Sequence, residues 1–366
     1  MATYRRHKST PIHADVFRVG ARLLGEKGLT LASAAPADLA VQIAAVFAAA
    51  RSPIRLHGTR AEEMFAYAMA AVGSVRAIKR EETDDLVVAI PDALVVPDFR
   101  VVLQDGADIL VEVKNFHDKD PSAAPRLTSD YLRKLSAYGA LFSRPVYLAV
   151  YWSVWRRWTL HNVNDLAGEL SSGLKLSFPE AYRRSEMRLL GDALLGTQYP
   201  LVLRFGVTSE MKERRGVRSK HLVRIESVEM SVAGKPIRNK RDQNIAFGLM
   251  LQGGWEEAER VEMDGDRIVA IEYSYAPETV QPDVGFAPVT ALSTLASSQF
   301  SDLTVNSGAV EQLRPQGLPS PPYPRVGEKY YGVDLPLWIL VLQPERRRPH
   351  SARKRGATRK TAKRNR

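Results

Sequence analysis

VVPDFRVVLQDGADILVEVKNF, residues 95–116, is the stretch that decides the fold of this chain. It predicts two short β-strands joined at Asp105-Gly106, a dipeptide that favours tight hairpin turns. Side chains alternate between the faces of a strand, so the second strand has one apolar face, and its opposite face carries Asp108, Leu110, Glu112 and Lys114. A carboxylate and an ammonium on such a strand are costly to bury unless they are paired or bind an ion.

The register of this hairpin decides whether Asp98, in the first strand, can join Glu112 on the charged face. A two-residue turn at Asp105-Gly106 would place Asp98 opposite Val113, on the wrong face. A loop with an odd number of residues, or a bulge, would bring it opposite Glu112 or Lys114. We therefore expect a three-residue loop, a bulge or a bend near Asp98.

Two neighbouring carboxylates in this position predict a site for a hard divalent cation. Mg²⁺ prefers oxygen ligands and is usually held by one or two carboxylates together with water and substrate phosphate. A bound metal ion lowers the pKa of its water and stabilises the charge that develops on a reacting phosphate. Asp98 and Glu112 are the expected metal ligands, and Lys114 is expected to orient or activate the attacking water.

Pro97-Asp98 followed by Glu112-Val113-Lys114 resembles the motif of the PD-(D/E)xK nuclease superfamily, which has the fold of restriction endonucleases and Holliday-junction resolvases. The resemblance covers about residues 55–165. It implies an α/β fold with a restriction-endonuclease-like α-β-β-β-α-β core, a Mg²⁺ or Mn²⁺ cofactor, and catalytic roles for the acids and the lysine of the motif.

A helix expected before the hairpin offers a third carboxylate. Thr59, with Glu62 three residues later, fits a capping box and predicts a helix start. In the resembled family a glutamate of this first core helix lies near the metal, which makes Glu62 a candidate catalytic residue and metal ligand. Glu62 shares a helix face with Phe65, whereas Glu63 lies about 100° round the helix, so Glu62 is favoured over Glu63.

A second helix, expected at 130–143, follows the hairpin and is amphipathic. In many members of the resembled family this helix lends a lysine or glutamine to the site. Lys134, with Tyr138 one turn later, is therefore a candidate substrate-binding residue, and an exposed helix lysine is the ordinary alternative. Two strands follow, from Pro145 and from Trp158, so the order of expected elements agrees with the core named above.

The length of the chain suits two domains, or one large domain with additions. We expect a helical N-terminal lead-in (1–54), a nuclease-like domain (55–165), a C-terminal α+β domain of unknown role (166–345) and a basic disordered tail (346–366). No apolar run is long enough for a transmembrane helix, so no membrane association is expected. The absence of cysteine excludes disulfides and thiolate zinc sites and fits a cytoplasmic location.

The net charge of +11 comes from the tail. Residues 346–366 hold eleven of the 52 Lys and Arg residues and no acid, which leaves 41 basic against 41 acidic residues in the rest of the chain. Such a tail suits a phosphate backbone through counterion release. A solvated tail without a dedicated partner has the same composition.

These observations favour a Mg²⁺-dependent nuclease that hydrolyses phosphodiester bonds, in DNA rather than RNA. The resemblance suggests restriction, recombination, repair or defence as its setting. A homodimer would follow if it cuts both strands, and the C-terminal domain could bind a protein partner. The alternatives are a non-catalytic nucleic-acid-binding protein that uses its tail and an inactive or accidental motif, and an interaction protein whose tail meets an acidic partner.

Overall fold

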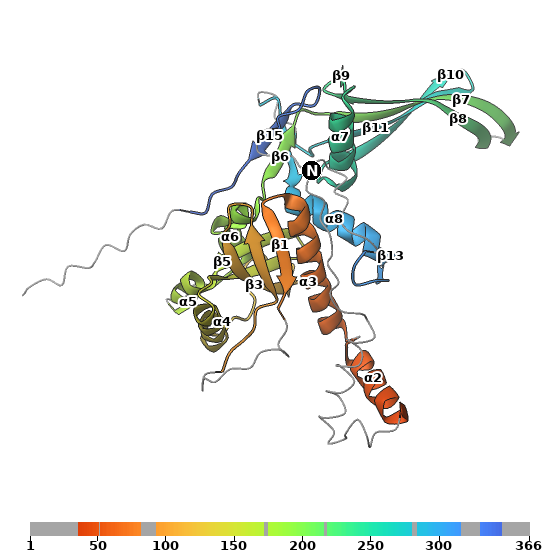
Figure 1. Cartoon of the computed structure of the whole chain (residues 1–366). Helices are drawn as coiled ribbons and strands as arrows, with labels where there is room; N and C mark the ends of the chain where they lie inside the picture. The colour runs from red at the N-terminus through yellow and green to blue at the C-terminus, as the bar shows by residue number, and fades with distance from the viewer. Residues whose placement is uncertain are drawn as a thin grey trace, which may run out of the picture.

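The structure is a computed structural model of the 366-residue chain (Figure 1). It describes residues 36–50, 52–81, 93–171, 175–215, 218–279, 284–315 and 330–345. The helix expected at 12–27, a strand expected at 86–90 and the basic tail lie outside these residues. In the part of the chain that is described, no helix is both long and apolar enough to cross a lipid bilayer.

A five-stranded mixed sheet, the first sheet, is built from the N-terminal half of the chain (Figure 1). Its strands lie in sequence order, and neighbours are antiparallel except β3 and β4, which are parallel. The strands are β1 (Val75–Arg80), β2 (Phe99–Leu103), β3 (Asp108–Phe116), β4 (Val146–Trp152) and β5 (Arg157–Asn162). The α/β class expected from the sequence is confirmed.

Helices cover both faces of the first sheet. Val111 and Val113 of β3 belong to the same buried cluster as Phe65 of α3 (Pro53–Val72). Leu110, on the opposite face of β3, packs in a second cluster with the buried side of α4 (Ser129–Leu141). A parallel pair of strands needs a crossover connection, and α4 lies in the one that joins β3 to β4.

The hairpin between β2 and β3 has the three-residue loop that the motif required. Leu103 donates its N–H to the carbonyl of Ala107 at 2.7 Å and closes a loop of Gln104, Asp105 and Gly106. Gly106 has φ +91°, a conformation that costs glycine little. The Asp105 carboxylate accepts the N–H of Ala107 at 2.9 Å. The Asp-Gly pair thus forms the turn, but with an odd loop length.

The predicted start of the first core helix was wrong. α3 begins at Pro53 with Ser52 as its N-cap, so Thr59 lies inside the helix and forms no capping box. Proline is favoured in the first turn because its φ is already helical and its missing N–H needs no partner. The interior Gly58 costs about 1 kcal/mol, which burial of the α3 face outweighs. The preceding helix, α2 (Pro36–Ala50), also begins at a proline.

The second half of the described chain holds three further sheets and is also mixed in class. One sheet has five strands in the order β10-β11-β7-β8-β9, another has the order β12-β6-β15, and β13 pairs with β14. The helices are α5 (Val163–Ser171), α6 (Phe178–Arg183), the 3₁₀ helix η2 (Met187–Leu190), α7 (Lys240–Gln252) and α8 (Leu292–Thr304). The strands are β6 (Leu194–Thr197), β7 (Leu201–Arg215), β8 (Arg218–Val232), β9 (Lys235–Pro236), β10 (Glu256–Asp264), β11 (Arg267–Ala276), β12 (Ala287–Ala291), β13 (Val305–Asn306), β14 (Ala309–Val310) and β15 (Leu337–Leu340).

Residues 179–195 have a helical pattern in the sequence, but the structure breaks this segment into shorter pieces. α6 and η2 replace its first part, and Gly191 follows in the left-handed region with φ +87°. The last residues join β6, which pairs with β12 on one side and β15 on the other. Pairing with distant strands therefore overrides the helical pattern of the sequence.

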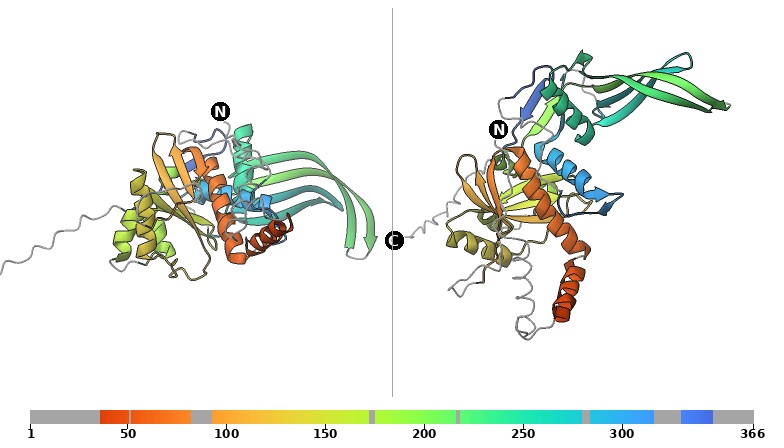
Figure 2. Two further views of the ribbon diagram at one scale, coloured as in Figure 1. Left: turned by 60° about the horizontal axis from the view of Figure 1, so that its bottom comes forward. Right: turned by 45° about the vertical axis from the view of Figure 1, so that its right-hand side comes forward.

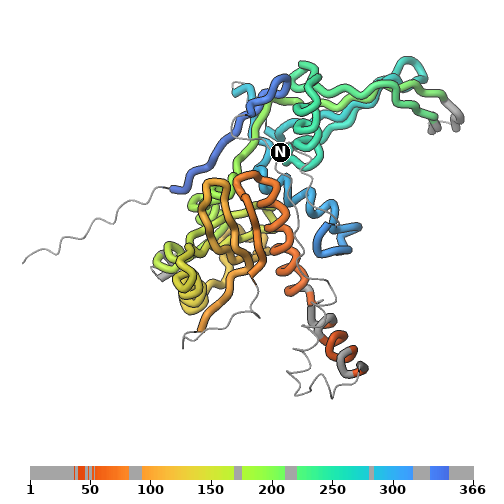
Figure 3. Tube along the Cα trace, viewed as in Figure 1, coloured from red at the N-terminus to blue at the C-terminus, as the bar shows by residue number. Residues whose placement is uncertain are grey.

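Four strands of this half, β7, β8, β10 and β11, form a long curved ribbon that projects from the other elements (Figures 1, 2 and 3). We call these four strands the arm. α7 packs against the base of the arm, where β7 begins.

The core of the first sheet includes side chains from near the end of the described chain. Phe300 of α8 is buried with Phe65, and its ring lies 5.5 Å from that of Tyr67 in an edge-on arrangement. Trp158 of β5 donates its Nε1–H to Ser297 Oγ at 2.9 Å. Residues before and after the expected domain boundary at 166 thus belong to one hydrophobic core. That the two parts fold independently of each other stays a prediction.

Candidate functional site

Strands β2 and β3 place two acids of the motif beside each other. Phe99 lies opposite Val111, and the same register continued by one residue sets Asp98 next to Glu112. Asp98 itself is in a bend just before β2, as expected. The Asp98 Oδ2 atom accepts the N–H of Val113 at 2.8 Å, which ties the bend to β3.

The Glu112 side chain is held by two neighbours. Glu112 is 5% exposed, and its Oε1 atom accepts hydrogen bonds from Lys114 Nζ and from the hydroxyl of Tyr131 on α4. Lys114 Nζ also lies 5.0 Å from the centre of the Tyr131 ring. The Lys114 side chain is 39% exposed, so the ammonium stands where the buried carboxylate meets solvent.

Burial raises the pKa of the Asp98 carboxyl to about 7, with further contributions from the negative charges of Glu112 and Glu62. The hydrogen bond from Val113 and the charge of Lys114 act in the opposite direction but do not compensate. Burial and the adjacent Glu112 also raise the pKa of Tyr131, which keeps its hydroxyl a donor. The cluster therefore carries more negative charge than its own cations neutralise.

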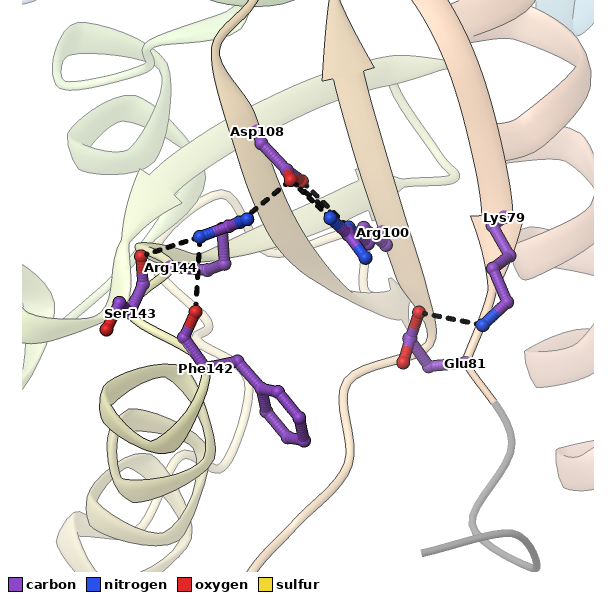
Figure 4. A network of polar contacts seen from close by, with 7 residues as sticks. All are labelled: Lys79, Glu81, Arg100, Asp108, Phe142, Ser143 and Arg144. Atoms are coloured by element: carbon purple, nitrogen blue, oxygen red, sulfur yellow. Dashed lines mark hydrogen bonds and ion pairs between the residues drawn. The ribbon is translucent and has the colours of Figure 1, made fainter.

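Asp108, at the other end of β3, is in the opposite electrostatic situation (Figure 4). Its carboxylate accepts hydrogen bonds from Arg100 Nε at 3.0 Å and from Arg144 Nε at 2.8 Å. These arginines lower the pKa of Asp108 to about 2, and the hydrogen bonds from Arg100 make the largest contribution. Asp108 is thus ion-paired with two arginines, whereas at Asp98 burial and the neighbouring carboxylates outweigh the nearby cations.

Arg80, at the end of β1, connects the α3 glutamates to this region. Its guanidinium pairs with Glu62 at 2.6 Å and with Glu63 at 3.1 Å, and it lies over the Phe99 ring at 4.8 Å. Both glutamates are therefore engaged by one arginine, while the charge of Glu62 still reaches Asp98. Arg80 stands at the start of a charged run, Arg80-Glu81-Glu82, and nothing in that run predicts its contact with Glu62.

The two candidate substrate-binding residues of α4 point to other partners. Lys134 Nζ pairs with Asp130 Oδ2 at 2.7 Å, one turn earlier on the same helix. The hydroxyl of Tyr138 donates to Glu81 Oε2 at 3.2 Å. The α4 side chain that contacts Glu112 is Tyr131. In the sequence, only its position three residues before the candidate Lys134, on the same helix, pointed to such a contact.

Oxygen ligands suited to a hard cation are present at the site. In the described residues, no group of three or more His, Asp and Glu side chains converges as a metal site. Asp98 and Glu112 nevertheless form a pair, and one or two carboxylates are what Mg²⁺ usually takes from a protein. The raised pKa of Asp98 fits such an ion, because a divalent cation would offset the surplus negative charge.

Replacing Tyr131 by phenylalanine should remove one of the two hydrogen bonds to Glu112 Oε1 and leave the aromatic ring next to Lys114. Loss of a hydrogen bond to a charged group is worth about 1.5–3 kcal/mol, but Glu112 keeps Lys114, so we expect only ~1 kcal/mol loss in unfolding free energy. Urea unfolding checks this value. Tyr138→Phe, which removes a bond to Glu81, is the matched control for the loss of one α4 hydroxyl.

Comparisons with known proteins give little further guidance. No protein-family model and no curated protein sequence matches the chain. Among solved structures, the chain is similar to Hjc, a Holliday junction resolvase of the archaeal hyperthermophile Archaeoglobus fulgidus. The match has 19% sequence identity and a TM-score of 0.22, and it covers 29% of this chain and 78% of that one.

Proposed function

We propose that this chain is a metal-dependent nuclease that hydrolyses phosphodiester bonds in DNA, with Asp98, Glu112 and Lys114 at its active site. The observation that supports this most is the juxtaposition of two carboxylates and one amine on adjoining strands. The high pKa of Asp98 adds to it, because burying a carboxylate beside a second carboxylate is costly in a purely structural role.

Asp98 and Glu112 would hold Mg²⁺ or Mn²⁺, which when bound activates water and stabilises charge on the scissile phosphate. Glu62 would act as an outer ligand through water, because Arg80 already binds its carboxylate. Arg80 would thereby fix the distance between α3 and the metal ligands. Glu63 shares the same arginine, so the choice of Glu62 rests on its electrostatic effect on Asp98.

Lys114 would orient the attacking water and, with its partly exposed ammonium, offset the charge of the phosphate. In the structure Lys114 pairs with Glu112, and it would exchange this partner for the phosphate of the substrate. Tyr131 would keep Glu112 in place during that exchange. Lys134 and Tyr138 would contact phosphate farther along the DNA, once Lys134 leaves the exposed Asp130.

The test is cleavage of supercoiled plasmid, linear duplex and four-way junction DNA with Mg²⁺ or Mn²⁺ and with EDTA. We expect cleavage that needs metal and that falls by about 10²–10⁴-fold in Lys114→Ala, the range for loss of a proton-transfer or water-positioning group. Lys79→Ala is the matched control, because Lys79 is an exposed lysine of the same sheet paired with Glu81.

Two outcomes would contradict the proposal. Cleavage that Lys114→Ala leaves unchanged would locate the reaction elsewhere or in a contaminant. DNA binding without cleavage under every metal would favour the non-catalytic binding protein. In that case binding should show a steep negative dependence on salt, because phosphate contacts release counterions.

A further inference from the structure

Three arginines near the candidate site form no ion pair with a carboxylate among the described residues. Three other arginines of this region, Arg80, Arg100 and Arg144, each pair with an acid. The unpaired ones are Arg60 of α3, Arg156 in the turn between β4 and β5, and Arg157 at the start of β5. Unpaired guanidinium groups beside a site for phosphodiesters are candidate contacts for the DNA backbone.

The turn between β4 and β5 lies at the same edge of the first sheet as Lys114. In the parallel register Lys114 is next to Val150 of β4, and Trp152, two residues later, pairs with Arg157. Neighbouring strands are about 4.8 Å apart and rise about 3.3 Å per residue, so the backbones of Lys114 and Arg157 lie within roughly 16 Å. One DNA strand has a phosphate about every 3.4 Å along the helix axis, so this distance spans about five nucleotides at most.

Arg156 has a backbone conformation that is costly for a large side chain. Its φ of +51° lies in the left-handed region. The turn is fixed by its neighbour Trp155, whose N–H donates to the carbonyl of Trp152 at 3.1 Å and whose ring stacks on Phe178 with centres 4.5 Å apart. Strained backbone that its surroundings maintain is concentrated at functional sites. Here the strained residue is an exposed arginine.

Helix α8 supports all three arginines. Thr294 Oγ1 accepts a hydrogen bond from Arg157 Nη1 at 2.7 Å and donates one to the carbonyl of Arg156 at 2.8 Å. Two turns later Ser301 Oγ accepts a hydrogen bond from Arg60 Nη2 at 3.0 Å. A helix rises 1.5 Å per residue, so these two anchoring hydroxyls are about 10 Å apart. Positive groups spread over such a distance suit a polyanion better than a single small anion.

The three guanidinium groups have a common neighbour in Tyr151. Burial raises the pKa of Tyr151, and the positive charges of Arg156, Arg60 and Arg157 act in the opposite direction. The charge of Arg157 also acts on the buried carboxyl of Asp192, which offsets part of it. The positive charge available to a ligand is therefore mainly that of Arg60 and Arg156.

We propose that Arg60 and Arg156 bind backbone phosphates of the DNA substrate beside the scissile bond, and that Arg157 and α8 hold them in position. This inference deepens the proposed nuclease function and rests on it. It gives α8, which lies outside the segment that resembles the nuclease family, a part in substrate binding. Phosphate contacts position a duplex without reading its bases, so the effect should be the same for every DNA sequence.

Fluorescence anisotropy of the full chain with a labelled DNA duplex, in EDTA so that the duplex stays intact, tests these contacts. Arg156→Gly is the main variant, because glycine adopts a positive φ without strain and the turn should keep its shape. Loss of one phosphate contact should reduce the slope of log affinity against log salt by about 0.9. If the two proteins bind alike at about 1 M salt, the variant should bind roughly eightfold more weakly at about 0.1 M.

Arg60→Gln should have a similar effect, and Arg60→Lys, which keeps the positive charge, should restore most of the affinity. Arg60 also contacts Ser301 and the Phe300 ring, so circular dichroism should show that the glutamine variant is folded. Arg76→Ala is the charge-matched control, because Arg76 is an exposed arginine near the start of β1, at the other edge of the sheet. It should change the affinity by less than about twofold.

An unchanged salt slope in Arg156→Gly would overturn the inference, and so would an equal loss of affinity in Arg76→Ala. If the wild type still cleaved DNA with metal in either case, the nuclease proposal would stand without these contacts. A wild type that neither binds nor cleaves DNA would contradict the proposed function itself, and this inference with it.

Discussion

Replacing Asp98 by asparagine is expected to stabilise the metal-free protein while it abolishes cleavage of DNA. The folded state raises the pKa of Asp98 from 3.8 to about 7, since the carboxylate is buried beside Glu112. The folded state therefore binds this proton more tightly than the unfolded state, so the carboxyl destabilises the protein increasingly as the pH rises from about 4 to 7. One pKa unit corresponds to about 1.4 kcal/mol, and we expect a gain of roughly 1–3 kcal/mol at pH 8 after local relaxation.

The gain should be measured by urea unfolding in EDTA at pH 8 and again near pH 4, where it should vanish. Added Mg²⁺ should stabilise the wild type and leave Asp98→Asn unchanged. Loss of a metal ligand removes several kcal/mol of transition-state stabilisation, so cleavage should fall by at least ~10².

Asp108→Asn is the matched control for this change, because it is the same substitution on the same hairpin. Arg100 and Arg144 lower the pKa of Asp108 to about 2, so its ionised form stabilises the folded state. Asp108→Asn should therefore destabilise the protein at pH 8, the opposite of the Asp98 variant. If Asp98→Asn were also destabilising in EDTA, Asp98 would be a structural residue rather than a ligand.

Asp242→Ala is expected to cost about 3–5 kcal/mol of unfolding free energy, the range for breaking a buried charged network. Asp242 on α7 is fully buried, and its Oδ2 atom accepts the N–H groups of Val333 at 2.7 Å, Asp334 at 2.6 Å and Leu335 at 3.0 Å. The hydroxyl of Tyr330 donates to its Oδ1 atom. Alanine would leave three backbone donors without their acceptor next to β15, and urea unfolding measures the loss.

Tyr330→Phe is the graded control, because it removes one of those four hydrogen bonds. It should cost about 0.5–1.5 kcal/mol, clearly less than Asp242→Ala. If Asp242→Ala lay within 1 kcal/mol of the wild type, water would be replacing the carboxylate, and the segment before β15 would be held by other contacts.

The hairpin and the side chains on it could be predicted because the features that determine them lie close together in the sequence. A glycine that must adopt a positive φ and an alternation with period two are both visible within twenty residues of sequence. Even the odd loop length followed from the requirement that Asp98 and Glu112 share a face. The fold class could be predicted from one further element, the helix between β3 and β4. A helical crossover joins parallel strands, and this pair makes the otherwise antiparallel sheet mixed.

The remaining contacts of the candidate site depend on how separate elements pack. Arg80 reaches Glu62 from a different strand, and Tyr131 reaches Glu112 across the gap between α4 and the sheet. No spacing in the sequence encodes either contact. Lys134, which the family resemblance implied as a candidate, pairs instead with Asp130, one turn away on its own helix.

The second half of the chain was harder to predict because its pattern is atypical. β10 reads EEAERVEMD and is exposed along nearly its whole length, so no hydrophobic alternation marks it as a strand. The buried side of α8 includes Ser293, Thr294 and Ser297, which are residue types more typical of loops than of a buried helix face. Their hydroxyls and amides are satisfied by partners far away in sequence, such as Asp192 and Trp158.

The packing of α8 on α3 has a consequence for synthesis of the chain. Phe300 leaves the ribosome long after Phe65. The first sheet is therefore synthesised while the side of α3 that packs against α8 is still exposed to solvent. Closing such a long separation is slow, and the waiting apolar surface is prone to aggregate or to engage chaperones. A shortened gene that stops after β5 should therefore yield insoluble product, and expression trials need a gene that extends past α8.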